Sequence, residues 1–325
     1  MSRSTKRVAV LAALALLAGL ALATNTTPAA SQDEAEPAPP TLEAITLPEG
    51  YSVPAVEAGT VQVSEANPGT GGESGLATEN DGEAGDPLES FAESVIGPDG
   101  RAQIGNTTNY PARAIGQIEG FDSVIGNYIC SGWLIDENTI LTAGHCVYPQ
   151  ANNIAETLEF FPGRNGGTDH FGSCFLIEVF APQEWVVNQN EYNDWAVGQL
   201  NCDIGETVGW FGYFSRTGKT AMKNIPARVQ GYPGDQAFGT MWGMGHKILT
   251  SQKKMVYYSI DTAGGQSGSP VYQPIRPACG GPCGMAIHAY GVHGGGPHGI
   301  RNHAPRITNP RFGLISEIAD DNNLV

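Results

Sequence analysis

One stretch of the chain decides the fold, and it reads CSGWLIDENTILTAGHC from Cys130 to Cys146. Its apolar residues predict a strand, which leads into a tight Ala-Gly-His-Cys turn. That turn holds the imidazole of His145 at the end of the strand. A lone histidine is more often an ordinary surface or core residue, so its meaning depends on what the rest of the chain provides.

Two further stretches provide complementary groups. Residues 192–200 read YNDWAVGQL and place Asp194 in a polar turn that enters a buried strand. Residues 261–272 read DTAGGQSGSPVY and place Ser267 among glycines, in a turn before another strand. The three side chains occur along the chain in the order His, Asp, Ser, and this conjunction is far more specific than any one of them.

The three residue types form a nucleophilic set when a fold brings them together. A serine hydroxyl becomes a good nucleophile only when an imidazole takes its proton and a buried carboxylate holds that imidazole. We therefore predict that His145, Asp194 and Ser267 are catalytic. The backbone N–H groups of Gly265 and Ser267 are the predicted oxyanion hole. The alternative G-x-S-x-G frame fails because Ser269 stands where its last glycine belongs.

The chain around these stretches reads as all-β. Short apolar or alternating runs separated by Gly, Pro, Asn and Asp predict strands; the clearest are Ala112–Ile118, Ile129–Ile135, Phe175–Phe180, Trp195–Leu200, Ile225–Gln230, Met255–Ile260 and Met285–Val292. One short helix is predicted at the C-terminal end, with Asn309 as N-cap and Pro310 in its first position. These runs favour one or two β-barrels or a sandwich.

The N-terminal part has a different composition. Residues 1–23 combine a basic start with an apolar run that ends in Ala-Leu-Ala, which predicts a secretory signal peptide. The alternative, a membrane anchor, needs a longer run. Residues 24–93 contain 14 acidic and no basic residues and few apolar ones, so this segment cannot build a core by itself. We predict a pro-segment that is removed from a secreted, extracellular protein.

Charge and cysteine usage narrow the class of protein further. The formal net charge is −16, but residues 94–325 hold 19 acidic and 14 basic residues, so most of the excess lies in the pro-segment. The sequence has no basic stripe of the kind that binds nucleic acid, so we predict no nucleic-acid partner. All six cysteines follow residue 93, which in a secreted protein predicts disulfides, although spacing alone leaves their pairing open.

Residues 94–325 resemble the chymotrypsin-type serine proteases, and more closely the bacterial glutamyl endopeptidases of Bacillus and staphylococci. The stretches that carry the resemblance, besides those of His145, Asp194 and Ser267, are SVIGPDGR (94–101), NTTNYP (106–111), VGWFGY (208–213), GYPGD (231–235) and MAIH (285–288). The resemblance implies two six-stranded antiparallel β-barrels, which we expect over residues 94–204 and 205–325. It also implies hydrolysis of polypeptides after acidic residues, with no cofactor and as a monomer.

The resemblance also implies a pairing of the cysteines. A Cys130–Cys146 bridge braces the histidine loop throughout the chymotrypsin family. A Cys279–Cys283 bridge matches a small loop of the Bacillus enzymes. The two cysteines that remain, Cys174 and Cys202, would then form the third bridge. The resemblance supplies no family counterpart for this pair.

Substrate choice is predicted by residues near Ser267. Asp261 lies six residues before the serine, where trypsin-like enzymes carry the acid that binds Arg or Lys, and this is the rival reading. The Bacillus glutamyl enzymes also have an Asp there, so it does not decide between them. Thr262 and His288 match the residues that bind the substrate carboxylate in the glutamyl group, and a histidine suits an anionic side chain.

The predicted N-terminus of the mature chain is Ser94. In animal relatives the freed amine pairs with an Asp just before the nucleophilic serine, but that position holds Gln266 here. The resemblance gives the amine of Ser94 another role, in binding the substrate carboxylate. Glu93 precedes it, so maturation would itself be a cut after Glu. The non-enzymatic alternative is a secreted binding protein.

Four histidines recur every five residues near the C-terminal end, at His288, His293, His298 and His303. This period fits neither a helix face nor a strand face, and no acidic residue is interleaved. We interpret the pattern as loop composition and predict no metal site, with a metal-binding role as the alternative.

Overall fold

The computed structural model describes residues 42–47, 61–71, 79–80 and 94–320. The predicted signal peptide, residues 1–23, and the predicted cleavage position at Glu93 lie outside these ranges. Among the described residues, no helix has the length and apolar character that a membrane crossing requires.

Six strands of the first half close into an antiparallel barrel in the order β9-β10-β7-β6-β5-β8, and β8 pairs back with β9. The strands are β5 (Ile115–Asp122), β6 (Gly126–Leu134), β7 (Thr139–Thr142), β8 (Thr157–Pro162), β9 (Cys174–Pro182) and β10 (Ala196–Leu200). Closure leaves no free edge within the ring of six strands. This barrel is the first of the two that the sequence predicts.

The second half forms two sheets that do not close by strand pairing within the described part of the chain. The larger one has the order β11-β17-β16-β12-β13-β4, and the smaller has the order β14-β15-β18. Their strands are β4 (Ala102–Ile104), β11 (Gly212–Arg216), β12 (Pro226–Gly231), β13 (Trp242–Lys247), β14 (Thr250–Ser251), β15 (Met255–Tyr258), β16 (Pro270–Arg276), β17 (Gly281–Ile287) and β18 (Asn302–Pro305). Two features differ from expectation: β11 and β17 pair in parallel, and β4, expected in the first barrel, pairs with β13.

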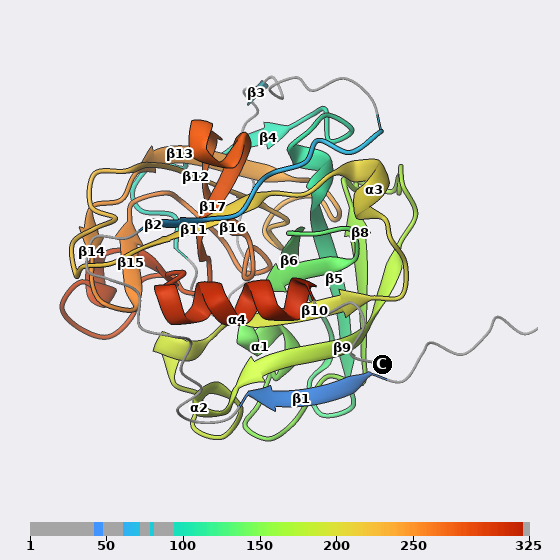
Figure 1. The fold of residues 1–325 in the computed structure, drawn as a ribbon, viewed down its shortest axis with the longest axis horizontal. Coiled ribbons are helices and arrows are strands. Elements are labelled where there is room, and N and C mark those ends of the chain that lie inside the picture. Colours follow the sequence, from blue (N-terminus) through green and yellow to red (C-terminus); the bar gives the residue numbers. More distant parts are fainter. Residues whose placement is uncertain (1–41, 48–60, 72–78, 81–93, 321–325) are drawn as a thin grey trace, which may run out of the picture. The chain divides into compact units, whose positions relative to one another are not determined.

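Three short strands from the acidic N-terminal segment add to these sheets, two at the edges of the larger sheet of the second half and one alongside the part of β9 that extends past β8. β1 (Glu43–Leu47) pairs in parallel with β9, β2 (Val61–Val63) pairs with β11, and β3 (Glu79–Asn80) pairs with β4. Figure 1 shows β1 alongside β9 and β2 alongside β11. A segment without its own core thus gains order by adding strands to existing sheets, which the sequence patterns do not predict.

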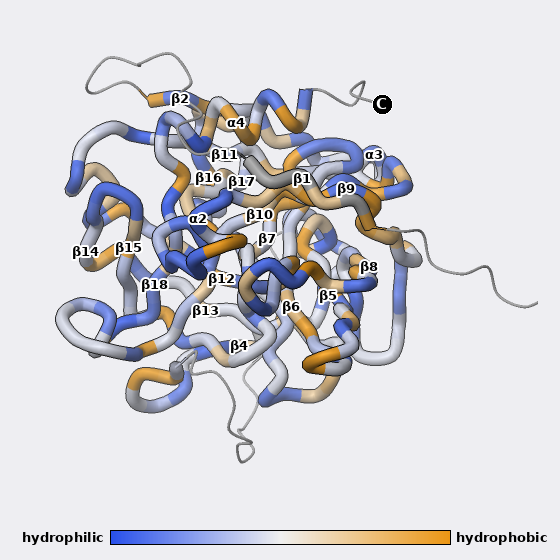
Figure 2. The backbone as a smooth tube through the Cα atoms, turned by 90° about the horizontal axis from the view of Figure 1, so that it is seen from below, coloured by the Kyte–Doolittle hydropathy of each residue, from blue (hydrophilic) through white to orange (hydrophobic). Residues whose placement is uncertain are grey.

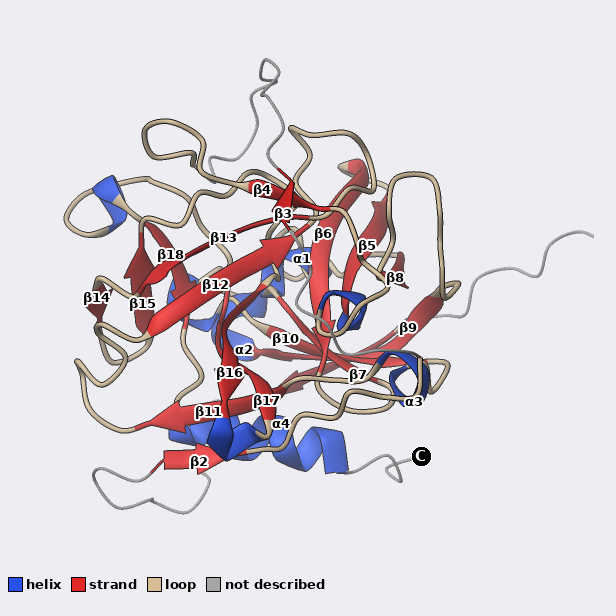
Figure 3. Cartoon of the chain, turned by 90° about the horizontal axis from the view of Figure 1, so that it is seen from above, coloured by secondary structure: helices blue, strands red, loops and turns tan. Residues whose placement is uncertain are grey.

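Helices are few and short except for the last one. The short helices are α1 (Gly144–Val147), α2 (Gln183–Val186), α3 (Gly205–Val208), η1 (Ala112–Ala114), η2 (Glu191–Asn193), η3 (Pro277–Cys279) and η4 (His298–Ile300). The predicted C-terminal helix is α4 (Asn309–Asp320), which buries Ile315 and Ile318. Hydrophobic and hydrophilic bands alternate along α4 in Figure 2, and Figure 3 shows it lying beside β11.

Aromatic rings join the cores of the two halves. Trp133 of β6 is fully buried and meets Phe211 edge-on at 5.4 Å between ring centroids, and Phe211 meets Tyr272 of β16 at 5.1 Å. These contacts tie the first barrel to the larger sheet of the second half. The structure joins the cysteines as Cys130–Cys146, Cys174–Cys202 and Cys279–Cys283.

Candidate active site

Strand pairing brings His145 and Asp194 together. β7 and β10 are neighbours in the barrel, and their register pairs Thr142 with Ala196. His145 follows β7 and Asp194 precedes β10, so the antiparallel pairing leaves both at the same end of the barrel. The Nδ1 of His145 lies 2.7 Å from Oδ2 of Asp194, and the backbone N–H of His145 donates to Oδ1 at 2.8 Å.

Burial matches the roles that the sequence predicts for these two groups. The Asp194 side chain is fully buried, whereas that of His145 is 28% exposed. Because the Asp194 carboxylate is shielded from solvent, it depends on the two hydrogen bonds from His145, and these fix its orientation. The imidazole keeps one side accessible.

The turn of Ser267 packs directly on the histidine segment. The backbone N–H of Ser131, on β6, donates to the Ser267 carbonyl at 2.7 Å, and Cys146 Sγ lies 3.7 Å from the same oxygen. Cys146 follows His145 in the chain, so the turn is anchored one residue from the imidazole. Ser267 itself is 7% exposed and lies three residues before β16 begins.

Glycines flank Ser267 because no other residue fits. Gly265 has φ +97° and Gly268 has φ +88°, and a Cβ on Gly268 would lie 1.9 Å from the carbonyl oxygen of Ser131. A Cβ on Gly265 would lie 2.6 Å from the carbonyl oxygen of Tyr232. The tight turn on which the predicted oxyanion hole depends therefore requires both glycines.

Asp261 is buried and its carboxylate is already occupied. Oδ1 accepts a hydrogen bond from the backbone N–H of Ile96 at 2.7 Å, and Oδ2 accepts one from that of Gly100 at 2.8 Å. The side chain thus binds the segment that follows Ser94. Backbone N–H groups therefore cap both oxygens of this acid.

Ser94 lies next to Thr262, one of the other two predicted specificity residues. Its carbonyl accepts from the Thr262 N–H at 3.4 Å, and its hydroxyl accepts from the Val292 N–H at 3.0 Å. Asn302 holds it from a third side, since its Oδ1 accepts from the Ser94 N–H at 3.3 Å and its Nδ2 donates to the Ser94 carbonyl at 2.6 Å. Asn302 has no motif around it, and sequence analysis missed it.

Gln266 is engaged away from Ser94. Its Oε1 accepts from the Ala263 N–H at 3.1 Å and from Arg101 at 3.4 Å. Arg101 in turn pairs with Asp99 at 2.8 Å and with Asp235 at 2.5 Å. Burial raises the pKa of Asp99, but its hydrogen bonds from Arg101 outweigh that effect and hold the pKa below its usual value.

Thr262 and His288 are both fully buried beside the turn of Ser267. The backbone N–H of Gly268 donates to the His288 carbonyl at 2.7 Å, which joins His288 to the residue after Ser267. Nδ1 of His288 lies 2.6 Å from the hydroxyl of Tyr258. Among the described residues, Thr262 Oγ1 finds no hydrogen-bond partner, and a buried hydroxyl in that state is a natural contact for a polar ligand.

Tyr290 is a further residue that sequence analysis missed, although it stands two positions after His288. Its ring centroid lies 6.1 Å from that of His145. Burial, together with the nearby Asp194 carboxylate, raises the pKa of its hydroxyl far above the usual value. Tyr290 therefore stays neutral and lines the His145–Asp194 pair.

Three of the four periodic histidines meet at one place, which their interpretation as loop composition does not anticipate. His293, His298 and His303 gather with Glu191 of η2, and one ligand atom from each lies within 4.8 Å of all the others. Glu191 comes from a distant part of the chain, where an interleaved pattern could not reveal it. His288 takes no part in this group and binds Tyr258 instead.

A closed barrel with His145, Asp194 and Ser267 grouped beside it is the arrangement that the sequence predicts for a serine protease, and the comparison with protein families agrees. The family model described as Trypsin matches residues 104–303, so the chain belongs to the trypsin family of serine proteases.

Within that family the chain is similar to glutamyl endopeptidases. The enzyme of that name from Bacillus licheniformis is 40% identical over 223 residues, which are 68% of this chain and 67% of that protein. The glutamyl endopeptidase of Staphylococcus aureus (strain MW2) is 28% identical over 193 residues, 57% of this chain and 56% of that protein. A solved structure of a Glu endopeptidase in complex with MPD is 28% identical, with a TM-score of 0.59, over 70% of this chain and 100% of that one.

Proposed function

We propose that this chain is a secreted endopeptidase, made as a precursor, that hydrolyses peptide bonds after Glu and less readily after Asp. Catalysis is assigned to His145, Asp194 and Ser267. The observation that carries the assignment of the triad is the pair of hydrogen bonds from His145 to the fully buried Asp194, next to the anchored turn of Ser267.

The proposed reaction proceeds through an acyl-enzyme. The Ser267 hydroxyl oxygen attacks the carbonyl carbon of the scissile bond while Nε2 of His145 takes its proton. The N–H groups of Gly265 and Ser267 stabilise the oxyanion that forms. The C–N bond then breaks as His145 returns the proton to the leaving amine, and water releases the acyl group by the same steps.

Glu specificity is supported by how charge is arranged around the substrate pocket. The rival reading, cleavage after Arg or Lys, needs the Asp261 carboxylate to face the substrate. Both of its oxygens instead accept backbone N–H groups of Ile96 and Gly100. His288, the buried Thr262 hydroxyl and the amine of a cleaved Ser94 are the groups that we assign to a substrate carboxylate.

Maturation by cleavage after Glu93 is supported by the surroundings of Ser94. Its backbone nitrogen is held by Asn302, and its carbonyl by Thr262. Gln266, at the position of the zymogen Asp, uses its oxygen for Ala263 and Arg101. A new amine at Ser94 would therefore form beside the proposed pocket rather than pair with residue 266.

Three peptides that differ only in the residue before the cut separate the candidate functions. We expect the purified mature protein to cleave a Glu peptide, with little activity on Arg or Leu peptides. His288→Ala is expected to lower kcat/KM for the Glu peptide by about 2–4 kcal/mol of transition-state binding, since a charge-assisted donor is lost. His246→Ala, an exposed histidine on β13, is the matched control.

Two outcomes of this assay contradict the proposal. A wild-type preference for Arg that disappears in Asp261→Asn would establish the trypsin-like alternative. Absence of cleavage of all three peptides by the correctly processed protein would favour a binding protein without catalysis.

A further inference from the structure

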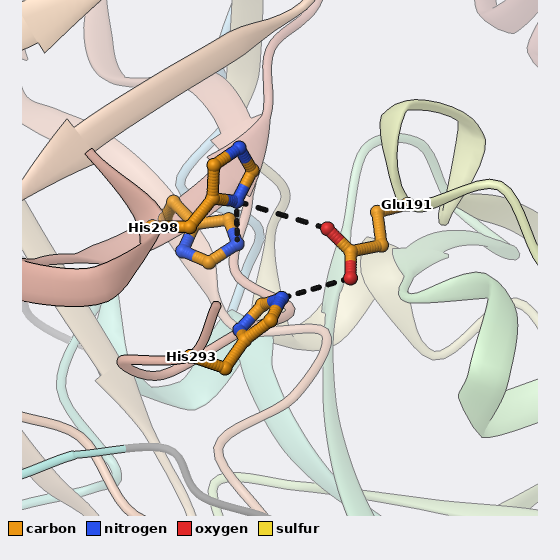
Figure 4. Close-up of side chains that lie close together, drawn as sticks. Glu191, His293 and His298 are labelled. Carbon is orange, nitrogen blue, oxygen red and sulfur yellow. Dashed lines mark hydrogen bonds and ion pairs between the residues drawn. The ribbon is translucent and has the colours of Figure 1, made fainter. Parts of the chain in front are cut away.

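We propose that Glu191, His293, His298 and His303 form a zinc site that links the two halves of the protein. Figure 4 shows the Glu191 carboxylate facing His293 and His298. Nε2 of His293 lies 2.8 Å from Oε1 of Glu191, and Nδ1 of His298 lies 3.7 Å from Oε2. Nδ1 of His298 also lies 3.0 Å from Nε2 of His303, which completes the group.

The outer nitrogens of the three rings have the partners that metal-bound histidines have. Nδ1 of His293 lies 3.2 Å from the Gly291 carbonyl, and Nδ1 of His303 lies 3.2 Å from the Arg301 carbonyl. Nε2 of His298 lies 3.0 Å from the Tyr257 hydroxyl. Histidine ligands of metals are commonly fixed through the other ring nitrogen by a carbonyl or a similar group.

These outer contacts determine which nitrogens carry lone pairs. A carbonyl oxygen only accepts, so the Nδ1 atoms of His293 and His303 carry the protons, and in neutral rings their Nε2 atoms carry lone pairs. The lone pair of His293 would then face a carboxylate at 2.8 Å, an arrangement that requires a cation between them or an extra proton.

The donor set and spacing favour zinc over other metals. Three imidazole nitrogens and one carboxylate oxygen suit Zn²⁺, whereas calcium and magnesium require mostly oxygen. Zn–N bonds of about 2.0–2.1 Å in a tetrahedron place neighbouring ligand atoms about 3.3 Å apart. The distances from His293 Nε2 to Glu191 Oε1 (2.8 Å) and from His298 Nδ1 to His303 Nε2 (3.0 Å) lie a little below that value, and His298 Nδ1 lies 3.7 Å from the second carboxylate oxygen.

The ligands come from both halves of the structure, which gives the metal a structural role. Glu191 stands three residues before Asp194 in the first half. In the second half, His293 and His298 lie between β17 and β18, and His303 lies in β18. The side chains of Glu191 and His293 are 37% and 38% exposed, so an ion can enter from solvent. A bound ion would hold the Asp194 segment against the segment of Tyr290, with no direct part in hydrolysis.

Metal binding is tested on the full chain without a polyhistidine tag, in the Ser267→Ala form to prevent self-digestion. We expect elemental analysis to find one zinc per chain, and the chelated protein to bind added Zn²⁺ in a one-to-one, submicromolar titration. Co²⁺ should give the visible absorption bands of a tetrahedral site. At 100 times Kd, zinc should raise Tm by roughly 5–10 °C.

Variants decide whether these four residues hold the ion. Glu191→Gln and His298→Ala are expected to weaken zinc binding more than about 100-fold, and Tyr257→Phe by about 10–100-fold because it loses only an outer contact. His246→Ala should bind as the unmodified protein does.

Two results would overturn the proposal. One is the absence of a saturable one-to-one site for Zn²⁺ and Co²⁺, which would mean that an imidazolium–carboxylate pair explains the group. The other is equal zinc affinity in Glu191→Gln, His298→Ala and His246→Ala, which would place the ion elsewhere.

Discussion

Replacing Asp194 by Asn tests the proposed catalytic pair most directly. The native carboxylate accepts two hydrogen bonds, one at each oxygen, from the backbone N–H and from Nδ1 of His145. An amide has one acceptor oxygen. If that oxygen keeps the fixed backbone N–H, the NH₂ group faces Nδ1 and donates to it, which forces the proton of a neutral imidazole onto Nε2. Nε2 can then no longer take a proton from Ser267.

The size of the effect follows from the lost charge. An imidazolium and a carboxylate about 4 Å apart attract each other by about 4 kcal/mol at an effective dielectric constant of 20. The charge-assisted hydrogen bond adds about 1.5–3 kcal/mol. At 1.36 kcal/mol per tenfold, this total corresponds to a fall in kcat of about 10⁴-fold, which agrees with the effect of this change in related triads.

The assay is kcat and KM on a Glu peptide at neutral pH, with circular dichroism and Tm as tests of folding. KM should change little, since Asp194 is buried away from the substrate. Asp203→Asn is the matched control, because Asp203 is an exposed acid of the same half of the molecule. Activity of Asp194→Asn within about tenfold of the Asp203→Asn control would refute the tautomer argument.

Three further predictions concern the N-terminus, an ion pair and a glycine. One residue added before Ser94 in the mature form should lower kcat/KM for Glu peptides; an active enzyme that retains residues 80–93, detected by mass spectrometry, would contradict this. Asp99→Asn should lower Tm at pH 6, and the difference in Tm from wild type should shrink below about pH 4. The folded pKa of Asp99 lies below its unfolded value of about 3.9, so its contribution to stability is present above that value and is lost as pH falls. A constant difference in Tm from pH 3 to pH 6 would exclude this linkage. Gly268→Ala should abolish folding, whereas Gly126→Ala, at a similar positive φ with nothing within 4 Å of the new Cβ, should lose about 1–2 kcal/mol of stability; equal losses measured by urea denaturation would show that the clash with Ser131 can be relieved.

The sequence predicts the strands around the first barrel well because their patterns are local. Ile129–Ile135 and Trp195–Leu200 correspond to β6 and β10 within a few residues. The Asn-Pro start of the final helix likewise corresponds to α4. Strands such as β13, with its WGMGHK sequence, carry no clear alternation, so only their pairing in the sheet identifies them.

The sequence offers candidate site residues where a short motif surrounds them, as for His145, Asp194 and Ser267. It does not offer Asn302 and Glu191, because each acts across the fold on a residue distant in sequence. Asn302 binds Ser94 over a separation of 208 residues, and Glu191 binds His293 over 102. No pattern of neighbours along the chain encodes such a contact, and only the pairing of the strands brings these residues together.

A protease that accepts an acidic substrate must first neutralise its own acids near the pocket. Here three buried or partly buried sets of carboxylates surround the turn of Ser267, and each already has donors. Asp194 is bound by His145, Asp261 by two backbone N–H groups, and Asp99 with Asp235 by Arg101. Because a carboxylate that is saturated with hydrogen bonds repels an incoming anion less, the presence of Asp261 is compatible with the proposed cleavage after Glu. The position that would mark a cation pocket in a trypsin-like enzyme here binds the backbone of Ile96 and Gly100, so under the proposed function the neighbours of the acid, rather than its presence, would decide between the two specificities.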